Sequence, residues 1–186
     1  MIDCKKLLVL AGVFALTSCV QTEKEVVEPK PRIAMSSVWD QPISLLAGTR
    51  IAIEPQVFPS NKLTPEQQQK IFAIYQEKIA EGLRKKGAIV DSQYGKFKLK
   101  YTIVLADNID QKLMESAFAI SPGLHTGSEN KGSFLMAVED QFSKTRVWRA
   151  AAQGYVEPNL TEEQRKQKAE QVVDQMLVQF FKIICS

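Results

Sequence analysis

Histidine and cysteine, the side chains that most often bind metals or act as nucleophiles, are scarce in this chain. Its 186 residues include one histidine, His125, and three cysteines. Structural zinc needs about four nitrogen or sulfur ligands. Two of the cysteines, Cys4 and Cys19, belong to the N-terminal segment described below, and His125 with the remaining Cys185 cannot supply such a set. A Ser/His/Asp triad would have to use His125, and no Gly-x-Ser-x-Gly motif accompanies it. We therefore expect no catalytic residue, no metal and no cofactor; the alternative is a hydrolase that uses His125.

The chain also lacks a strong net charge. Its 24 Lys and Arg residues nearly balance 21 Asp and Glu residues, which gives a formal charge of +3. Domains that bind nucleic acid usually carry a marked basic excess, so we expect no nucleic-acid partner. The hydrophobic fraction of 45% and the charged fraction of 24% are close to the averages of soluble domains, and the length predicts one domain.

No hydrophobic run is long enough to span a membrane. The longest near the N-terminus, from Leu7 to Leu16, has about ten residues, half of the roughly twenty that a transmembrane helix needs. Lys5 and Lys6 precede it, and small residues follow it. A basic start, a short apolar run and small residues are typical of an export signal.

The residues that end this segment, Leu16, Thr17, Ser18 and Cys19, resemble the lipobox of bacterial lipoprotein precursors. The resemblance implies that residues 1–18 are a signal peptide and that Cys19 is the lipid attachment site. Several acyl chains hold a protein stably on a membrane, whereas one binds only marginally. We therefore expect the mature protein to contact membrane lipid through acylated Cys19.

The neighbours of this motif extend the prediction. Val20 stands where an aspartate would resemble an inner-membrane retention signal, so the outer membrane is expected, with the domain facing the periplasm. Cys4 leaves with the signal and Cys19 is consumed by lipid, which leaves Cys185 alone. No intramolecular disulfide is then available, and the fold must depend on its core.

Residues 19–44 are polar and interrupted by prolines, a composition that predicts a lipid-anchored tether. Near its end Val38, Trp39 and Ile43 are more apolar. They could begin the domain as an edge strand or offer a patch to a partner, and docking on the domain's own core is the favoured interpretation. Residues 45–186 are predicted to form a single α+β domain.

Two capping boxes predict the two helices. Thr64 with Gln67 and Thr161 with Gln164 each combine an N-cap threonine with a glutamine three residues later, ahead of an apolar stripe of helical spacing. The first helix should end near Lys86, before a glycine. Alternation and turn residues predict strands at 49–53, 88–90, 97–105, 133–142 and 146–156. Residues 107–132 stay open, with a strand or short helix followed by a loop.

Together these elements predict an α+β fold. We expect a mixed, mainly antiparallel sheet of about four to six strands in the order β-α-β-β-β-β-α, with both amphipathic helices on one face.

The segment from Leu135 to Phe180, with Glu139 and Asp140 before a turn and a capped helix at its end, resembles the C-terminal half of the DUF4136 lipoprotein domain. The resemblance implies an envelope lipoprotein of uncharacterised function and supplies no catalytic residues. We accordingly expect a non-catalytic module that binds an envelope protein, glycan or lipid.

One basic feature is a candidate for such binding. Lys96, Lys98 and Lys100 alternate with apolar residues and should share the solvent face of one strand. Such a face could meet an anionic partner. The alternative is an outer face that lysines merely solvate or protect from edge pairing.

Overall fold

The computed structural model describes residues 33–58, 63–105, 118, 131–157 and 159–182, and all structural statements concern these. In this part of the chain six strands and two helices follow one another. They are β1 (Ala34–Trp39), β2 (Arg50–Pro55), α1 (Pro65–Lys85), β3 (Ile89–Val90), β4 (Phe97–Leu105), β5 (Lys131–Asp140), β6 (Arg146–Tyr155) and α3 (Glu162–Phe181).

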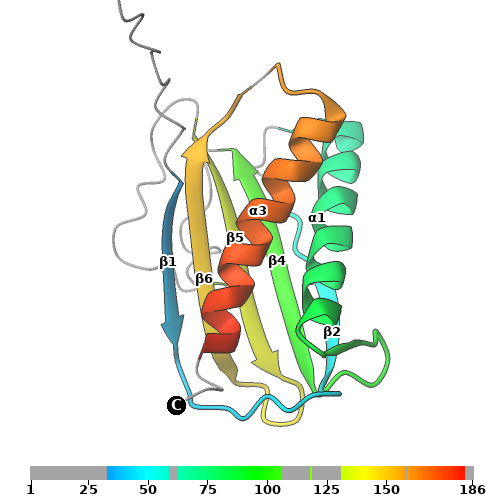
Figure 1. Ribbon diagram of the computed structural model, residues 1–186, viewed down its shortest axis with the longest axis vertical. Helices are drawn as coiled ribbons and strands as arrows, with labels where there is room; N and C mark the ends of the chain where they lie inside the picture. The colour runs from blue at the N-terminus through cyan, green and yellow to red at the C-terminus, as the bar shows by residue number, and fades with distance from the viewer. Residues whose placement is uncertain (1–32, 59–62, 106–117, 119–130, 158, 183–186) are drawn as a thin grey trace, which may run out of the picture. The chain divides into compact units, whose positions relative to one another are not determined.

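The strands form one mixed sheet with the order β1-β6-β5-β4-β2-β3. The pairs β1/β6, β6/β5 and β5/β4 are antiparallel, whereas β4/β2 and β2/β3 are parallel. Both helices lie on the same face of this sheet (Figure 1). The predicted α+β class, the mainly antiparallel sheet and the two helices on one face are confirmed, with one more strand at the start.

That additional strand, β1, corrects the predicted extent of the tether. Residues 34–39 pair along their whole length with β6, so the fold begins inside the range 19–44 that we assigned to the tether. Trp39 anchors the strand because its ring stacks on Phe180 of α3 at 5.5 Å. β1 is an edge strand that packs on the domain's own core. This agrees with the interpretation that the sequence favoured for Val38 and Trp39.

The capping boxes are present in both helices. The Thr64 side chain accepts a hydrogen bond from the backbone N–H of Gln67 while the Gln67 side chain accepts one from the Thr64 N–H, at 3.3 and 3.0 Å. Thr161 and Gln164 repeat the arrangement at 3.2 and 2.8 Å. α1 ends at Lys85, close to the expected residue, and two orphan donors are satisfied at each helix start.

The main core lies between the helices and the sheet. Its largest fully buried side chains include Trp148, Tyr101, Phe97 and Phe180. The Tyr101 hydroxyl donates a hydrogen bond to the backbone carbonyl of Phe72 in α1 at 2.9 Å, so this buried polar group has a partner. Burial raises the pKa of Tyr101, which keeps the hydroxyl protonated as a donor.

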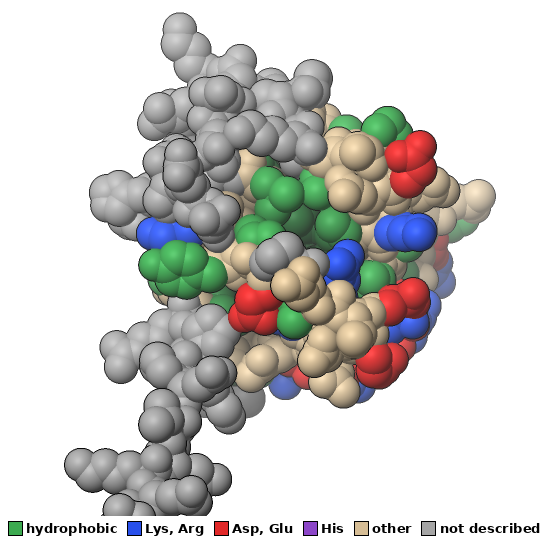
Figure 2. Space-filling view, turned by 90° about the horizontal axis from the view of Figure 1, so that it is seen from above, with side chains coloured by type: hydrophobic (Ala, Val, Ile, Leu, Met, Phe, Trp, Pro, Cys, Tyr) green, Lys and Arg blue, Asp and Glu red, His purple; other side chains and the backbone are tan. Residues whose placement is uncertain are grey.

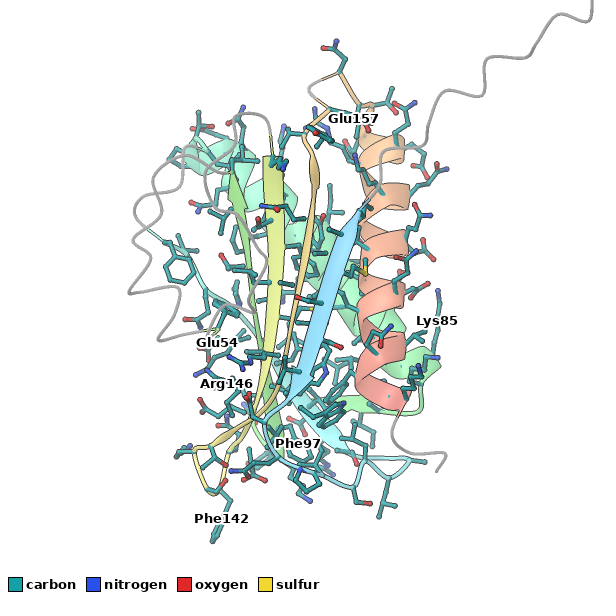
Figure 3. The ribbon with its side chains drawn as sticks, turned by 90° about the vertical axis from the view of Figure 1, so that its left-hand side faces the viewer. Glu54, Lys85, Phe97, Phe142, Arg146 and Glu157 are labelled. Carbon is teal, nitrogen blue, oxygen red and sulfur yellow. The ribbon has the colours of Figure 1, made fainter. Side chains whose placement is uncertain are left out.

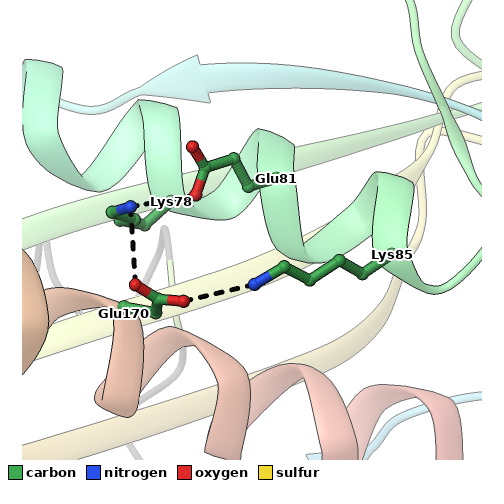
Figure 4. A network of polar contacts seen from close by, with 4 residues as sticks. All are labelled: Lys78, Glu81, Lys85 and Glu170. Atoms are coloured by element: carbon green, nitrogen blue, oxygen red, sulfur yellow. Dashed lines mark hydrogen bonds and ion pairs between the residues drawn. The ribbon is translucent and has the colours of Figure 1, made fainter.

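The helices also contact each other closely. Gly82 of α1 faces Leu177 of α3, and a Cβ atom added at Gly82 would lie 2.5 Å from the Leu177 Cδ1 atom. On the outer side Glu170 of α3 pairs with Lys78 and Lys85 of α1 at 3.5 and 3.2 Å (Figure 4). A small residue inside and ion pairs outside therefore fix the spacing of the two helices.

The β5–β6 hairpin forms where the sequence predicts it. The Asp140 carboxylate accepts hydrogen bonds from the backbone N–H groups of Phe142 and Ser143, both at 2.9 Å. The bond from Ser143 contributes most to holding the pKa of Asp140 below its usual value.

Most of the segment 107–132, which the sequence left open, lies outside the described residues. Phe118 is described and is buried on the sheet face away from the helices. Lys131 and Gly132 are also described and begin β5.

Candidate functional site

The starts of α1 and α3 and the ends of β4 and β6 lie at the same end of the domain (Figure 1). A cleft of about 390 Å³ opens there. We call it the end cleft. Its lining residues are Ile33, Leu63, Gln67, Ile71, Ile74, Tyr75, Ile103, Leu105, Gly132, Ser133, Phe134, Ala152, Gly154, Tyr155, Val156, Glu157, Leu160, Arg165, Lys168 and Val172. The size lies within the range of small-molecule sites, near its lower end.

Small residues on the sheet make the floor of the end cleft. Gly132 of β5 pairs directly with Gly154 of β6, and Ala152 follows two residues away on the same face. A Cβ atom at Gly132 would lie 3.1 Å from Val156, whereas one at Gly154 would lie in ordinary contact with Ile33 at 3.5 Å. The space exists because these positions of the sheet carry no large side chain, unlike the filled core beside them.

The walls are apolar. Ile71, Ile74 and Tyr75 come from α1, and Ile103 and Phe134 come from the sheet. The Tyr75 ring lies 4.5 Å from the Phe134 ring, so the two aromatic side chains brace the wall against each other. Burial raises the pKa of Tyr75 to about 12, and its hydroxyl stays uncharged at neutral pH.

The rim carries charge. The Lys168 ammonium donates to a carboxylate oxygen of Glu157 at 3.1 Å and to the Tyr155 carbonyl at 3.4 Å. Arg165 donates through Nε to the Leu160 carbonyl at 3.1 Å. Figure 2 looks onto this end and shows hydrophobic side chains gathered in a hollow with basic and acidic groups around it. An apolar interior with a charged rim suits an amphiphilic ligand.

The predicted basic face lies elsewhere and is largely neutralised. Lys98 forms an ion pair with Glu54, and Lys100 pairs with Glu139 at 2.8 Å. The Lys98 hydrogen bond is the main cause that holds the pKa of Glu54 below its usual value. Lys96 lies over the ring of Phe97 rather than beside these pairs, at 5.1 Å.

These pairs are on the sheet face opposite the helices, where Glu54 and Arg146 are labelled in Figure 3. Arg146 and Arg149 also share Asp40 there, at 2.8 and 3.4 Å. An anionic partner would have to displace these carboxylates, so the geometry lends the predicted face no support, and it stays a prediction.

Two other predicted residues, Cys19 and His125, lie outside the described residues. Within the described ranges, no group of three His, Cys, Asp or Glu side chains is arranged to hold a metal ion. Neither α1 nor α3 is long and apolar enough to cross a membrane, and the other described residues add no such helix.

The end cleft was not predicted from the sequence. A signal for it is present in β6, where the small residues Ala152 and Gly154 stand two apart and therefore share the face of the strand that lines the cleft. Small residues pack poorly in a sheet interior and often mark close approach or open space. The position of Gly132 opposite Gly154 needs the strand register, which the sequence alone does not provide.

Comparison with known proteins finds similar folds but no matching family. No family model matches the chain, and no curated protein matches it. Several solved structures are similar to it. A PDZ domain protein from Parabacteroides distasonis has a TM-score of 0.52 at 14% identity, over 81% of this chain and 36% of that one. This chain therefore spans about a third of that protein.

Two further structures are similar at lower scores. A PelC dodecamer from Paraburkholderia phytofirmans has a TM-score of 0.47 at 12% identity, over 78% of this chain and 95% of that one. A DUF4136 family protein from Bacteroides thetaiotaomicron has a TM-score of 0.41 at 13% identity, over 80% of this chain and 95% of that one. At these identities the likeness concerns the fold and assigns no activity.

Proposed function

We propose that this protein is a lipid-anchored envelope protein, held in the outer membrane through Cys19, whose domain binds a hydrophobic ligand on the periplasmic side. The observation that carries the binding role is the end cleft, an apolar space of about 390 Å³ that the described residues enclose without filling. Burying a ligand methylene there contributes about 0.8 kcal/mol, so even a short aliphatic segment gives measurable affinity.

Of the partners expected from the sequence, the chemistry of the end cleft favours a lipid. A glycan needs many hydrogen bonds, and a peptide needs partners for its backbone groups. The walls of Ile71, Ile74 and Phe134 provide neither. An aliphatic chain needs only exclusion from water, which these side chains supply.

The anchor fits this role by distance. Ile33 lines the end cleft, and it lies 14 positions after Cys19 in the chain. Even fully extended, that length of chain reaches at most about 50 Å. The cleft of an acylated protein therefore stays near the membrane surface, where aliphatic ligands are abundant.

The binding role is tested with N-phenyl-1-naphthylamine, an uncharged fluorescent probe. We use the mature chain from residue 19 with Cys19→Ser, so that no attached lipid competes. We expect saturable binding to this protein and a loss of at least tenfold in affinity with Gly154→Leu, which places an aliphatic side chain on the cleft floor. Ala34→Leu, on an exposed position of β1, is the matched control and should bind normally. Equal binding by all three proteins would contradict the proposal.

The anchor is tested separately. Wild-type protein should fractionate with the outer membrane and incorporate labelled palmitate, whereas full-length Cys19→Ser protein should do neither. A Cys19→Ser protein that still partitions with membranes would refute the anchor without affecting the cleft.

A further inference from the structure

We infer that the end cleft takes one acyl chain of an anionic membrane phospholipid and that Lys168 and Arg165 meet its head group. The inference rests on the proposed function, because it names the ligand class of the same cleft. It adds the number of chains, the sign of the head-group charge and the residues that distinguish one head group from another.

The size of the cleft limits the occupant to one chain. A volume of about 390 Å³ is near the lower end of the range for sites that enclose a drug-sized ligand. The floor of Gly132 and Gly154 and the wall of Ile71 and Ile74 leave a single apolar space. A phospholipid would therefore insert one chain and leave the second chain and the head group outside.

The charge of the rim favours an anion. Among the described residues, the ionisable side chains that line the cleft, apart from its tyrosines, are Arg165, Lys168 and Glu157. They carry two positive charges and one negative charge, so the rim has a net positive charge. Lys168 already pairs with Glu157 at 3.1 Å, and a phosphate beside the two cations would share them with that carboxylate.

The geometry places these charges at the mouth and not in the interior. Arg165 is exposed and Lys168 is half-buried on the first turns of α3, while Val172, one turn further along the helix, is buried against the core. Figure 3 shows Glu157, the partner of Lys168, at the outer end of the domain. An acyl chain that enters between the helices and the sheet would leave its head group beside these three residues.

The test compares three ligands below their critical micelle concentrations, each displacing the neutral probe from the Cys19→Ser mature chain. Lysophosphatidylglycerol is anionic, lysophosphatidylcholine has the same single chain with a zwitterionic head group, and laurate is a free fatty acid. We expect lysophosphatidylglycerol to bind about threefold or more tightly than lysophosphatidylcholine, as partly exposed charges allow. We expect laurate to bind more weakly than lysophosphatidylglycerol, because it has no glycerol-phosphate head group for Lys168 and Arg165 to contact.

Variants of α3 separate a head-group role from a structural one. Lys168→Gln should lower the affinity for lysophosphatidylglycerol about threefold and leave that for lysophosphatidylcholine unchanged. Lys166→Gln is the matched control, because Lys166 also pairs with a carboxylate, that of Glu162 at 3.0 Å, but does not line the cleft. It should change neither affinity.

Each contrary outcome overturns the inference in a different way. Equal affinity for the two lysophospholipids, unaffected by Lys168→Gln, would refute the anionic selection. Tighter binding of laurate would refute a phospholipid as the source of the chain. In both cases the proposed function stands as long as the neutral probe still binds and Gly154→Leu still lowers its affinity at least tenfold. Loss of the probe site itself would refute both.

Discussion

The contact between Gly82 and Leu177 gives a prediction whose size follows from the structure. With Gly82→Ala, the new Cβ atom would lie 2.5 Å from Leu177 Cδ1, whereas non-bonded carbons prefer about 3.5 to 4.0 Å. Leu177 is 1% exposed and must move by about 1 Å inside a filled core. Overpacking of this kind costs about 1 to 3 kcal/mol.

Helix propensity acts in the opposite direction. Replacing glycine by alanine inside a helix contributes about 1 kcal/mol. The net expectation is a loss of about 1 kcal/mol in the free energy of unfolding, or a fall in Tm of about 2 to 4 °C for a chain of this length. Urea denaturation followed by circular dichroism measures the change. Ala73→Gly, at an exposed position of the same helix, measures the propensity term alone.

A double-mutant cycle isolates the contact. Leu177→Ala alone should cost about 2 to 5 kcal/mol because it leaves a cavity. In the Gly82→Ala, Leu177→Ala protein the new methyl group enters that space. The double variant should therefore lose less free energy of unfolding than the two single variants lose in total, by about 1 kcal/mol or more. Stabilisation by Gly82→Ala, with strictly additive effects in the double variant, would refute the reasoning.

Three further predictions concern other parts of the fold. Thr161→Ala removes a capping-box acceptor from α3 and should cost about 1 kcal/mol by urea denaturation; no change would show that α3 does not need its cap. Trp39→Ala removes the ring stacked on Phe180 and should raise hydrogen exchange of β1 amides above that of β5, and unchanged β1 protection would contradict the proposed anchoring. Glu170 has a pKa below 4.5, chiefly through its hydrogen bond from Lys85. Its stabilising contribution is therefore complete above pH 4.5 and is lost as the pH falls through the lower folded value, a loss that Glu170→Gln should remove from the acid limb of a stability profile.

Local sequence signals predicted the elements that depend on neighbouring residues. Both helices begin at their capping boxes, because a threonine and a glutamine three residues apart satisfy each other's backbone donors. The 97–105 strand followed from the alternation of apolar residues with Lys98, Lys100 and Thr102. The expected solvated face is present only in its first part, because residues 101–104 are buried on both faces of the sheet.

The features that escaped prediction depend on contacts between distant residues. β1 falls inside the range assigned to the tether because that range was defined by its polar, proline-interrupted composition, whereas the strand forms by pairing with β6. The lysine face looked free because Lys100 meets Glu139 only through the register of β4 with β5. The cleft floor likewise depends on a cross-strand pair of glycines.

The measurement that tests the central claim most directly is a methyl NMR titration of the Cys19→Ser mature chain with lysophosphatidylglycerol. The isoleucine methyl groups of Ile71, Ile74 and Ile103 line the end cleft, whereas those of Ile79 and Ile89 do not. We predict saturable shifts of the first three signals, with the other two unchanged. Shifts confined to Ile79 or Ile89, or no shifts at saturating ligand, would contradict the account of this domain as a binding module built around its end cleft.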